Sequence, residues 1–341
     1  MIGIEILASV IISALATFFI TPYAIRYFRL IGLLTTDVHK KNKPLVPNSA
    51  GVPVVAGIIA GLLVYTFITV FIHQESSQLV YLFASITSIL IIMFSGFLDD
   101  LNSRQVKIAG HIEGKQGLKA WQKPLLTLPA AFPLMAIMAG DTTMNLPLIG
   151  TADFGILYPL LIVPIGVVGA SNMVNLLGGY NFLEAGMGLV YTLSLGIYAY
   201  LHGSIIASAI FLTTFGALLG IAKYNFYPAK ILSGDSLTYT LGAVVAVGAI
   251  VGNMEKATVI TMAPFIIQGI LKFYSRFKLG RFASDLGILQ KDGTIKPKYG
   301  KQIYSWIHLI TNLGNLNEKQ IVFVMMIIQA IFSLIPFLGI L

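Results

Sequence analysis

Two adjacent carboxylates close one of the apolar segments of this 341-residue chain. Asp99 and Asp100 end the run Phe94-Ser-Gly-Phe-Leu-Asp-Asp. Neighbouring acids at the C-terminal end of a helix repel each other and face the negative pole of its dipole, unless a cation or a basic group lies nearby. The pair therefore indicates either a solvated helix terminus or a place where a cation binds.

Amide side chains close a second apolar segment. Asn172 and Asn175 are three residues apart, which puts both on one helix face. They suit either ligand binding or hydrogen bonding between helices. The glycine-rich run Leu177–Gly186 follows and carries Asn181 and Glu184. Such a turn either lets the backbone approach a ligand closely or merely joins two helices.

Two further groups precede apolar segments. Asp235, within Ser233-Gly-Asp-Ser, is a short oxygen ligand for a hard cation or an N-cap of the next helix. Lys123, beside Trp121, fits the common role of a positive anchor at the membrane surface. Carboxylates with amides suit Mg²⁺, with Mn²⁺ as the alternative ion, and Mg²⁺ completes its coordination with substrate phosphate oxygens. These groups predict chemistry on a pyrophosphate.

The composition assigns the chain to a membrane. It is 56% hydrophobic and 11% charged, with a mean hydropathy of +0.84, outside the range of soluble domains. Without cysteine it has neither disulfides nor a thiolate metal site.

The first apolar stretch is a retained span and not a signal peptide, because it opens with Glu5 and is too long. Since a span takes about 20 residues, we predict one integral membrane domain, 1–341, of about ten transmembrane helices, at 3–25, 51–72, 79–98, 124–140, 155–172, 185–201, 204–222, 236–252, 257–274 and 320–340.

Basic residues orient these spans. Of the 22 Lys and Arg residues, all except Lys256 fall in odd-numbered loops or at the span ends beside them. Because basic residues favour cytoplasmic loops, both termini are expected outside and every motif above at the cytoplasmic surface. The net charge of +8 does not indicate nucleic-acid binding, since the basic residues flank spans and form no basic domain.

Two loops have structure of their own. The segment Thr143 to Phe154 predicts a small external β-hairpin. In the cytoplasmic loop 275–319, a subregion expected to grip substrate, Lys291-Asp292-Gly293 signals a hairpin. There, Tyr299 to Leu313 predicts an amphipathic helix that could lie at the interface. The expected fold class is therefore an all-α polytopic membrane protein with these additions.

Taken in order, the motifs resemble one enzyme family, the polyprenyl-phosphate N-acetylhexosamine-1-phosphate transferases. The chain is most similar to the UDP-GlcNAc:dolichyl-phosphate GlcNAc-1-phosphotransferase branch of archaea and eukaryotes. The resemblance rests on the loop from Asp37 to Gly51, Gly96–Asp100, Asn172–Gly186, Tyr227-Pro228 and Gly234–Ser236.

The resemblance implies ten spans, a cytoplasmic active site and a homodimer, in a prokaryotic cell membrane or, for a eukaryote, the ER membrane. It further implies that Asn175 and Asp235 hold Mg²⁺ and that Lys123 contacts the phosphates. By the same comparison Asp99 and Asp100 serve the lipid acceptor or the catalytic geometry.

The donor side of the site follows from the same resemblance. Asn181 and the backbone near Val38 would recognise uracil, and Arg281 would grip the donor. The chain departs from the eukaryotic branch at Arg281-Phe282-Ala283, where an Arg-His-Arg run is expected. It also lacks the bacterial histidine cluster and has Gly178 and Asn181 where bacterial relatives carry aspartates, which argues against a pentapeptide-bearing donor. The remaining substrate-binding residues are expected to be Asp37, Asn48, Asn172 and Glu184.

The activity so implied is transfer of N-acetylhexosamine-1-phosphate, GlcNAc-1-phosphate first among the candidates, from a UDP-sugar to a polyprenyl phosphate. The products are a polyprenyl-diphosphate-sugar and UMP, as in the first membrane step of glycan assembly for protein N-glycosylation. The alternative is a secondary transporter of a phosphorylated or anionic solute, whose sites would lie near the midplane of the membrane. A CDP-alcohol phosphotransferase is a further rival, but its run of spaced aspartates with an Ala-Arg pair is missing.

Overall fold

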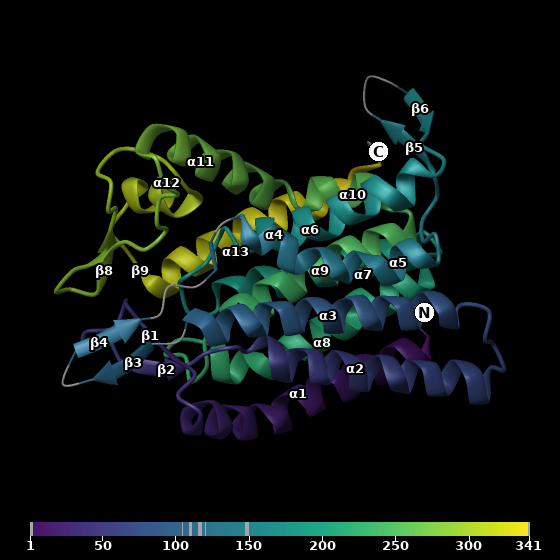
Figure 1. Cartoon of the computed structure of the whole chain (residues 1–341), viewed down its shortest axis with the longest axis horizontal. Helices are drawn as coiled ribbons and strands as arrows, with labels where there is room; N and C mark the ends of the chain where they lie inside the picture. Colours follow the sequence, from purple (N-terminus) through teal and green to yellow (C-terminus); the bar gives the residue numbers. More distant parts are fainter. Residues whose placement is uncertain are drawn as a thin grey trace.

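The fold is a bundle of long helices with small antiparallel sheets at its two ends (Figure 1). A computed structural model describes residues 3–103, 105–108, 111–114, 118–119, 121–146 and 150–339. Part of the basic loop after Asp100, including Arg104 and Lys115, lies outside the described residues. The helices are α1 (Ile4–Leu30), α2 (Gly51–Phe67), α3 (Leu79–Ser103), α4 (Gln122–Thr127), α5 (Phe132–Ala136), α6 (Val163–Val174), α7 (Leu183–Leu201), α8 (Ile205–Asn225), α9 (Gly234–Gly252), α10 (Glu255–Thr261), α11 (Ala263–Leu279), α12 (Trp306–Leu313) and α13 (Glu318–Leu334).

Every strand pairing in the described ranges is antiparallel. The strands are β1 (Leu34–Thr36) with β2 (Leu45–Pro47), β3 (Gln105–Ile108) with β4 (His111–Gly114), β5 (Thr143–Leu146) with β6 (Gly150–Asp153), and the three-stranded sheet of β7 (Ile288–Leu289), β8 (Thr294–Lys296) and β9 (Leu316–Asn317). The pair β5–β6 falls within the segment predicted as an external hairpin. The pair β7–β8 is joined by the predicted Lys291–Gly293 turn, where Gly293 has φ +87°.

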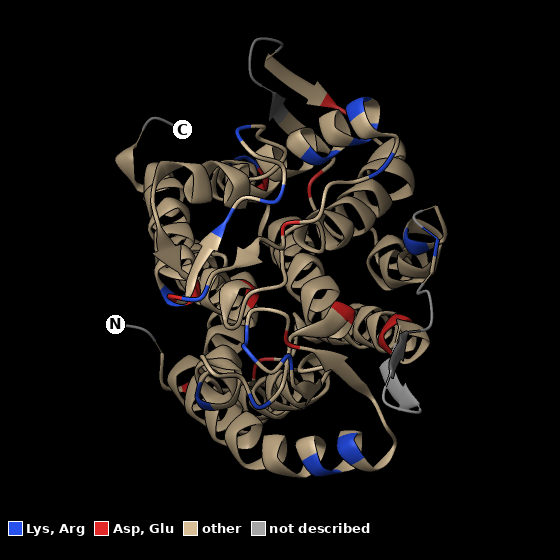
Figure 2. Ribbon diagram, turned by 90° about the vertical axis from the view of Figure 1, so that its left-hand side faces the viewer, with Lys and Arg blue, Asp and Glu red and all other residues tan. Residues whose placement is uncertain are grey.

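The two ends of the bundle differ (Figure 1). The strands β1–β4 and β7–β9 gather at one end with α12, and β5–β6 and both chain termini lie at the other. Figure 2 looks onto the first end, where many Lys and Arg residues lie in loops and at helix ends. We call it the charged end. Asp99, Lys123, Asn175, Asn181 and Asp235 all belong to elements that meet there.

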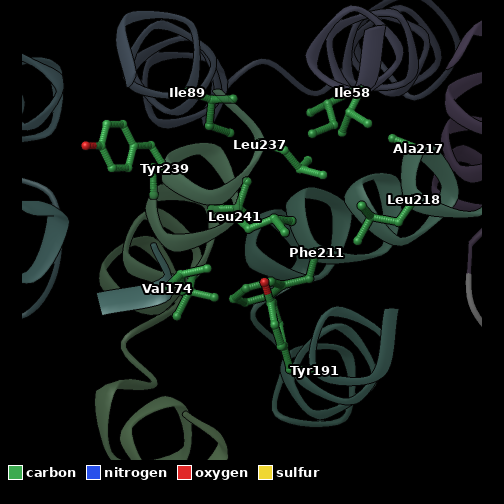
Figure 3. Close-up of a cluster of buried hydrophobic side chains, with 14 of the residues drawn as sticks. Ile58, Ile89, Val174, Tyr191, Phe211, Ala217, Leu218, Leu237, Tyr239 and Leu241 are labelled. Carbon is green, nitrogen blue, oxygen red and sulfur yellow. The ribbon is translucent and has the colours of Figure 1, made fainter. Parts of the chain in front are cut away.

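Helix α9 lies in the middle of the bundle and is apolar on all sides, as expected of a fully enclosed helix (Figure 3). In its most apolar 18-residue stretch, 83% of the residues are buried. Figure 3 shows Leu237 and Leu241 of α9 surrounded by Ile58 from α2, Ile89 from α3 and Phe211 from α8. The N-terminus of α9, with Asp235, is therefore held at the centre of the charged end.

The chain is a polytopic membrane protein. Within the described ranges six helical segments are long and apolar enough to cross a bilayer, and α10 with α11 forms a seventh if a pair bent by 62° counts as one. The range 124–140, predicted as one span, is not a continuous helix. It consists of α4, a 3₁₀ turn over Leu128–Ala131 and α5. Pro124, Pro129 and Pro133 recur through it, and each lacks the N–H that a regular helix needs.

The amphipathic helix predicted over Tyr299 to Leu313 was wrong in its start. The helix, α12, begins only at Trp306, because the hydroxyl of Ser305 accepts the His308 N–H at 3.2 Å and caps it. One face of α12 packs inside the subregion. Ile307 and His308 are buried, and the Trp306 indole donates to the Pro264 carbonyl of α11 at 2.7 Å.

Candidate active site

A cavity of about 500 Å³ opens at the charged end, within the size range of ligand sites. Four stretches of chain form most of its wall: the end of β1 with the following loop, the turn between α6 and α7, the start of α9, and the segment after α11. Of the predicted site residues, the cavity is lined by Asp37, Val38, Asn48, Asn175, Asn181, Glu184 and Asp235.

The first turn of α9 is capped by a carboxylate from another helix. Asp100, at the end of α3 and 1% exposed, accepts the backbone N–H groups of Asp235 at 2.7 Å and Ser236 at 3.1 Å. The Asn48 amide at 3.0 Å and the Ser49 hydroxyl at 2.6 Å complete its bonds. These N–H groups have no partner inside their own helix, and a negative charge there is stabilised by the helix dipole. Asp100 therefore fastens α3 and the 48–49 loop to α9.

Glycine permits this close approach of α3 to α9. A Cβ atom on Gly96 would lie 2.5 Å from the Asp235 carbonyl oxygen, well inside contact distance. Gly234, with φ +66°, occupies a backbone region that side chains disfavour, and a Cβ there would lie 2.5 Å from the Asp100 carboxylate. The glycines that open the Gly96–Asp100 and Gly234–Ser236 motifs are thus explained by the packing of one helix end.

Asp99 points to a different partner from its neighbour, because successive residues on a helix face different directions. Its Oδ2 lies 2.8 Å from the Lys123 ammonium, and the same ammonium lies 2.7 Å from Oδ2 of Asp235. The Tyr239 hydroxyl donates to Asp99 at 3.3 Å. One lysine thus serves two carboxylates, one from α3 and one from α9.

The donor set suits a hard divalent cation. The Asp235 carboxylate and the Asn175 amide line the same cavity, and the Asn175 Oδ1 atom accepts the Thr238 hydroxyl at 2.9 Å. In the described part of the chain there is no group of three or more His, Cys, Asp or Glu side chains that could hold a metal. Mg²⁺ needs none, since it commonly binds through one or two protein oxygens and substrate phosphates.

A further part of the wall is the turn between α6 and α7. The Asn181 side chain donates to Asp37 at 3.2 Å and accepts the Ala229 N–H at 2.9 Å. Glu184 accepts the Gly179 N–H at 3.1 Å and the Ser233 hydroxyl at 3.0 Å. The turn is thus tied both to the loop after β1 and to the start of α9.

Two predicted substrate contacts lie elsewhere. The Asn172 amide donates to the Thr127 hydroxyl at 3.1 Å and to the Val168 carbonyl at 2.8 Å, and Asn172 is not part of the cavity wall. The hydrogen bond to Thr127 of α4 is the bond between helices that the sequence offered as one of two roles for Asn172. Arg281 is exposed and also outside the wall, whereas its neighbour Phe282 lines the cavity.

Sequence reasoning overlooked a buried ion pair in this wall. Lys272 of α11 lines the cavity and binds Asp285 at 2.6 Å and the Ala283 carbonyl at 2.6 Å. Gln268, one turn earlier, also donates to Asp285 at 3.2 Å. A signal existed, because Gln268 and Lys272 are polar residues four apart on the buried face of a largely apolar helix. In the count of basic residues by loop, Lys272 is one of those at the end of the predicted span 257–274.

His39 lies behind this wall and was also missed. It is 3% exposed, and its ring stacks on the Tyr180 ring with centroids 4.4 Å apart. Burial lowers the pKa of His39 to about 4, assisted by the charge of Lys40. The ring is therefore neutral at physiological pH and serves as an aromatic support for Tyr180, which lines the cavity.

The chain is similar to known proteins over most of its length. The family described as glycosyl transferase family 4 matches residues 81–253, just over half of the chain. A Saccharolobus solfataricus protein, provisionally named UDP-N-acetylglucosamine–dolichyl-phosphate N-acetylglucosaminephosphotransferase, is 29% identical over 97% of this chain and 96% of its own. A Sulfolobus acidocaldarius protein with the same name is 30% identical over 97% of this chain and 94% of its own.

The similarity extends to bacterial proteins. A phospho-N-acetylmuramoyl-pentapeptide-transferase of Streptococcus thermophilus is 28% identical over 76% of each chain. The matched family segment runs from α3 to the end of α9 and so contains Asp99, Asp100, Lys123, Asn175 and Asp235. The protein therefore belongs to glycosyl transferase family 4.

Proposed function

We propose that the protein transfers N-acetylglucosamine-1-phosphate from UDP-N-acetylglucosamine to a polyprenyl (dolichyl) phosphate. The observation that carries the proposal is the placement of Lys123 between Asp99 and Asp235, with Asp235 on the wall of a ligand-sized cavity. The names of the two archaeal relatives supply the substrate class. The products are a polyprenyl-diphosphate-sugar and UMP, as in the first membrane step of glycan assembly.

In the proposed reaction, a phosphate oxygen of the lipid attacks the β-phosphorus of the UDP-sugar. The bond between this phosphorus and the oxygen bridging to the α-phosphorus breaks, and UMP leaves with that oxygen. Since the second pKa of a phosphate monoester is about 6, the acceptor is already largely dianionic at neutral pH. A strong base is not needed, so the role proposed for Asp99 is to orient the acceptor with Lys123.

Phosphoryl transfer depends mainly on positioning and on neutralising the charge of the phosphoryl oxygens. The Lys123 ammonium supplies one positive charge directly beside Asp235. Asp235 and Asn175 would hold Mg²⁺, or Mn²⁺, and the ion would supply further charge neutralisation on the phosphates when bound. Asn181 and Val38, which line the same cavity, are proposed to contact the uridine part of the donor.

The acceptor is proposed to approach from the bilayer near α11. This helix bends away from α10 by 62°, and its outer face is apolar, with Ile270, Phe273 and Phe277 exposed. Arg276 and Lys278 follow in its last turn. An apolar face with basic residues at its end suits the boundary between acyl chains and headgroups. We further propose that the charged end faces the cytoplasm and that the chain has ten spans with both termini outside. The proposed assembly is a homodimer.

The transporter alternative receives less support. Its binding site would lie near the midplane of the membrane, between broken helices. Here the cavity lies at one end of the bundle, and its charged residues come from helix ends and loops.

The test uses the purified full-length protein with a polyprenyl phosphate, Mg²⁺ and a panel of UDP-sugars, and measures UMP release. UMP is expected from UDP-N-acetylglucosamine, with loss of activity in EDTA and recovery with Mg²⁺ or Mn²⁺. Omission of the lipid is the control, and it should abolish release. Absence of UMP with every donor would overturn the proposal.

A further inference from the structure

The start of α13 is joined to the cavity wall by a buried carboxylate that none of the predicted motifs includes. Glu318, the first residue of α13, is 4% exposed. Its Oε1 atom accepts the backbone N–H of Asn181 at 2.7 Å, and its Oε2 atom accepts the Lys40 ammonium at 2.6 Å. A buried carboxylate is stable only where such partners satisfy both of its oxygens.

The contacts of Glu318 close a ring with two residues of the cavity wall. Lys40 also lies 3.2 Å from the Asp37 carboxylate, and Asp37 in turn accepts the Asn181 side-chain amide at 3.2 Å. Asp37 and Asn181 line the cavity, whereas Lys40 and Glu318 do not. The ion pair of Lys40 with Glu318 is therefore connected to the cavity through its contacts with Asp37 and Asn181.

The turn held by this ring needs outside support. Phe182, next to Asn181, has φ +70°, a conformation that residues with a side chain rarely adopt. Such strain persists only where surrounding contacts fix it. The position of Glu318 is itself fixed, because Asn317 and Gln320 form a capping box that sets where α13 begins.

We propose that Glu318 is a positioning residue for the UDP-sugar. It holds the Asn181 turn in the shape that binds the donor, with one oxygen on Asn181 and the other on Lys40. Because β9 directly precedes α13 and pairs with β8, the same contact links the 275–319 subregion to the donor wall. The inference rests on the proposed function and extends it to a residue that does not touch substrate.

The test compares Glu318→Ala, Glu318→Gln and Lys40→Met with the wild type in the UMP-release assay. Loss of a hydrogen bond to a charged group predicts an increase in the KM for UDP-N-acetylglucosamine of about tenfold or more in Glu318→Ala. The kcat and the KM for the lipid should change by less than about threefold, because only donor binding is affected. Glu318→Gln keeps an acceptor for the Asn181 N–H, so its donor KM should lie between the values of Glu318→Ala and the wild type. Lys41→Met, an exposed change beside Lys40, is the matched control.

A double variant of Lys40 and Glu318 distinguishes a positioning role from a general loss of structure, because it shows whether their effects on the donor KM add. Because Lys40 and Glu318 act as one unit, the double variant Lys40→Met/Glu318→Ala should raise the donor KM no further than Glu318→Ala alone. An unchanged donor KM in Glu318→Ala and Glu318→Gln would overturn the inference. So would a loss confined to kcat.

A binding measurement distinguishes failure of this inference from failure of the proposed function. Calorimetry with UMP needs no turnover, and UMP affinity is expected to fall about tenfold in Glu318→Ala, in line with the lost hydrogen bond. Equal affinity in variant and wild type would refute the role of Glu318 even where UMP release is normal. Normal UMP binding without any UMP release would refute the transferase reaction instead.

Discussion

At the scale of single residues, the adjacent carboxylates Asp99 and Asp100 have separate tasks. Asp99 contacts Lys123 and through it Asp235, whereas Asp100 is enclosed by donors of the protein itself. The sequence left open whether this pair was a solvated helix terminus or a place where a cation binds, and in the structure both acids are buried. The sequence could not identify the partners, because backbone N–H groups and a lysine from distant segments reach the acids only through the packing of α3 against α9.

Substitution of each carboxylate by its amide should separate these tasks. Asp100→Asn replaces one accepting oxygen by a donor group facing other donors, so we expect a clear loss of stability, roughly 2–4 kcal/mol. Asp99→Asn leaves Lys123 paired with Asp235, so it should fold normally and lose activity by a factor on the order of 10². Thermal unfolding in detergent and UMP release measure the two effects. A stable, inactive Asp100→Asn protein would contradict the capping role.

The metal assignment is tested at Asp235. Asp235→Asn removes the cavity-lining carboxylate that Lys123 contacts, so UMP release should fall by a factor on the order of 10²–10³ at any Mg²⁺ concentration. Asp292→Asn, in the exposed turn between β7 and β8, is the control and should be fully active. Turnover close to wild type in Asp235→Asn with excess lipid acceptor would refute Asp235 as a ligand.

His39 predicts a pH dependence of stability. Its pKa is about 4 in the folded protein and about 6.5 in an unfolded chain. The unfolded chain therefore takes up a proton first as the pH falls, and the folded state loses about 3 kcal/mol between pH 6.5 and pH 4. Above pH 6.5 the titration of His39 does not change the free energy of unfolding. Carboxylates also titrate in this window, so the measurement is the difference in thermal unfolding between wild type and His39→Gln. Parallel pH profiles for the two proteins would contradict the assignment.

At the scale of elements, the N-terminus of α9 organises the site, because α2, α3 and α6 all pack around that helix. Hydropathy identified α9 as a span and indicated its polar start. It could not show that Gly96 lies against the Asp235 carbonyl, since contacts between helices depend on tertiary packing. Prolines recurring through 124–140 were visible in the sequence, yet mean hydropathy does not register them, so it could not show the 3₁₀ turn between α4 and α5.

A pair of glycine substitutions tests this packing. Gly96→Ala places a Cβ atom 2.5 Å from backbone of α9 and should separate the helices, lowering both thermal stability and UMP release. Gly166→Ala, in α6, meets its nearest atom at 3.9 Å. There alanine should be neutral or stabilising by up to about 1 kcal/mol, because it favours helix more than glycine does. Equal behaviour of the two variants would show that the α3–α9 approach is not tight.

At the scale of the whole molecule, the one-sided charge gains a structural meaning. The basic loops and the cavity occupy the same end of the bundle, and the termini occupy the other (Figure 1). Charge counting can indicate this arrangement, because loops on one side of a membrane must meet at one end of a helix bundle. It cannot show which loops touch the cavity. Arg281 was expected there and lies outside the wall, whereas the buried Lys272 and Glu318 carry contacts that a loop-by-loop count does not reveal.

The orientation itself can be measured, since the chain contains no cysteine and any introduced thiol is unique. We expect Lys41→Cys and Lys298→Cys, at exposed positions of the charged end, to react with an impermeant maleimide only from the cytoplasmic side of sealed vesicles. Ser76→Cys, before α3, and Lys256→Cys, in the first turn of α10, are exposed at the other end and should react only from outside. Labelling of Lys41→Cys and Lys256→Cys from the same side would mean that an odd number of spans between them had been miscounted. The cytoplasmic position of the cavity would then no longer follow from the charge pattern, because that pattern orients the site only through the count of spans.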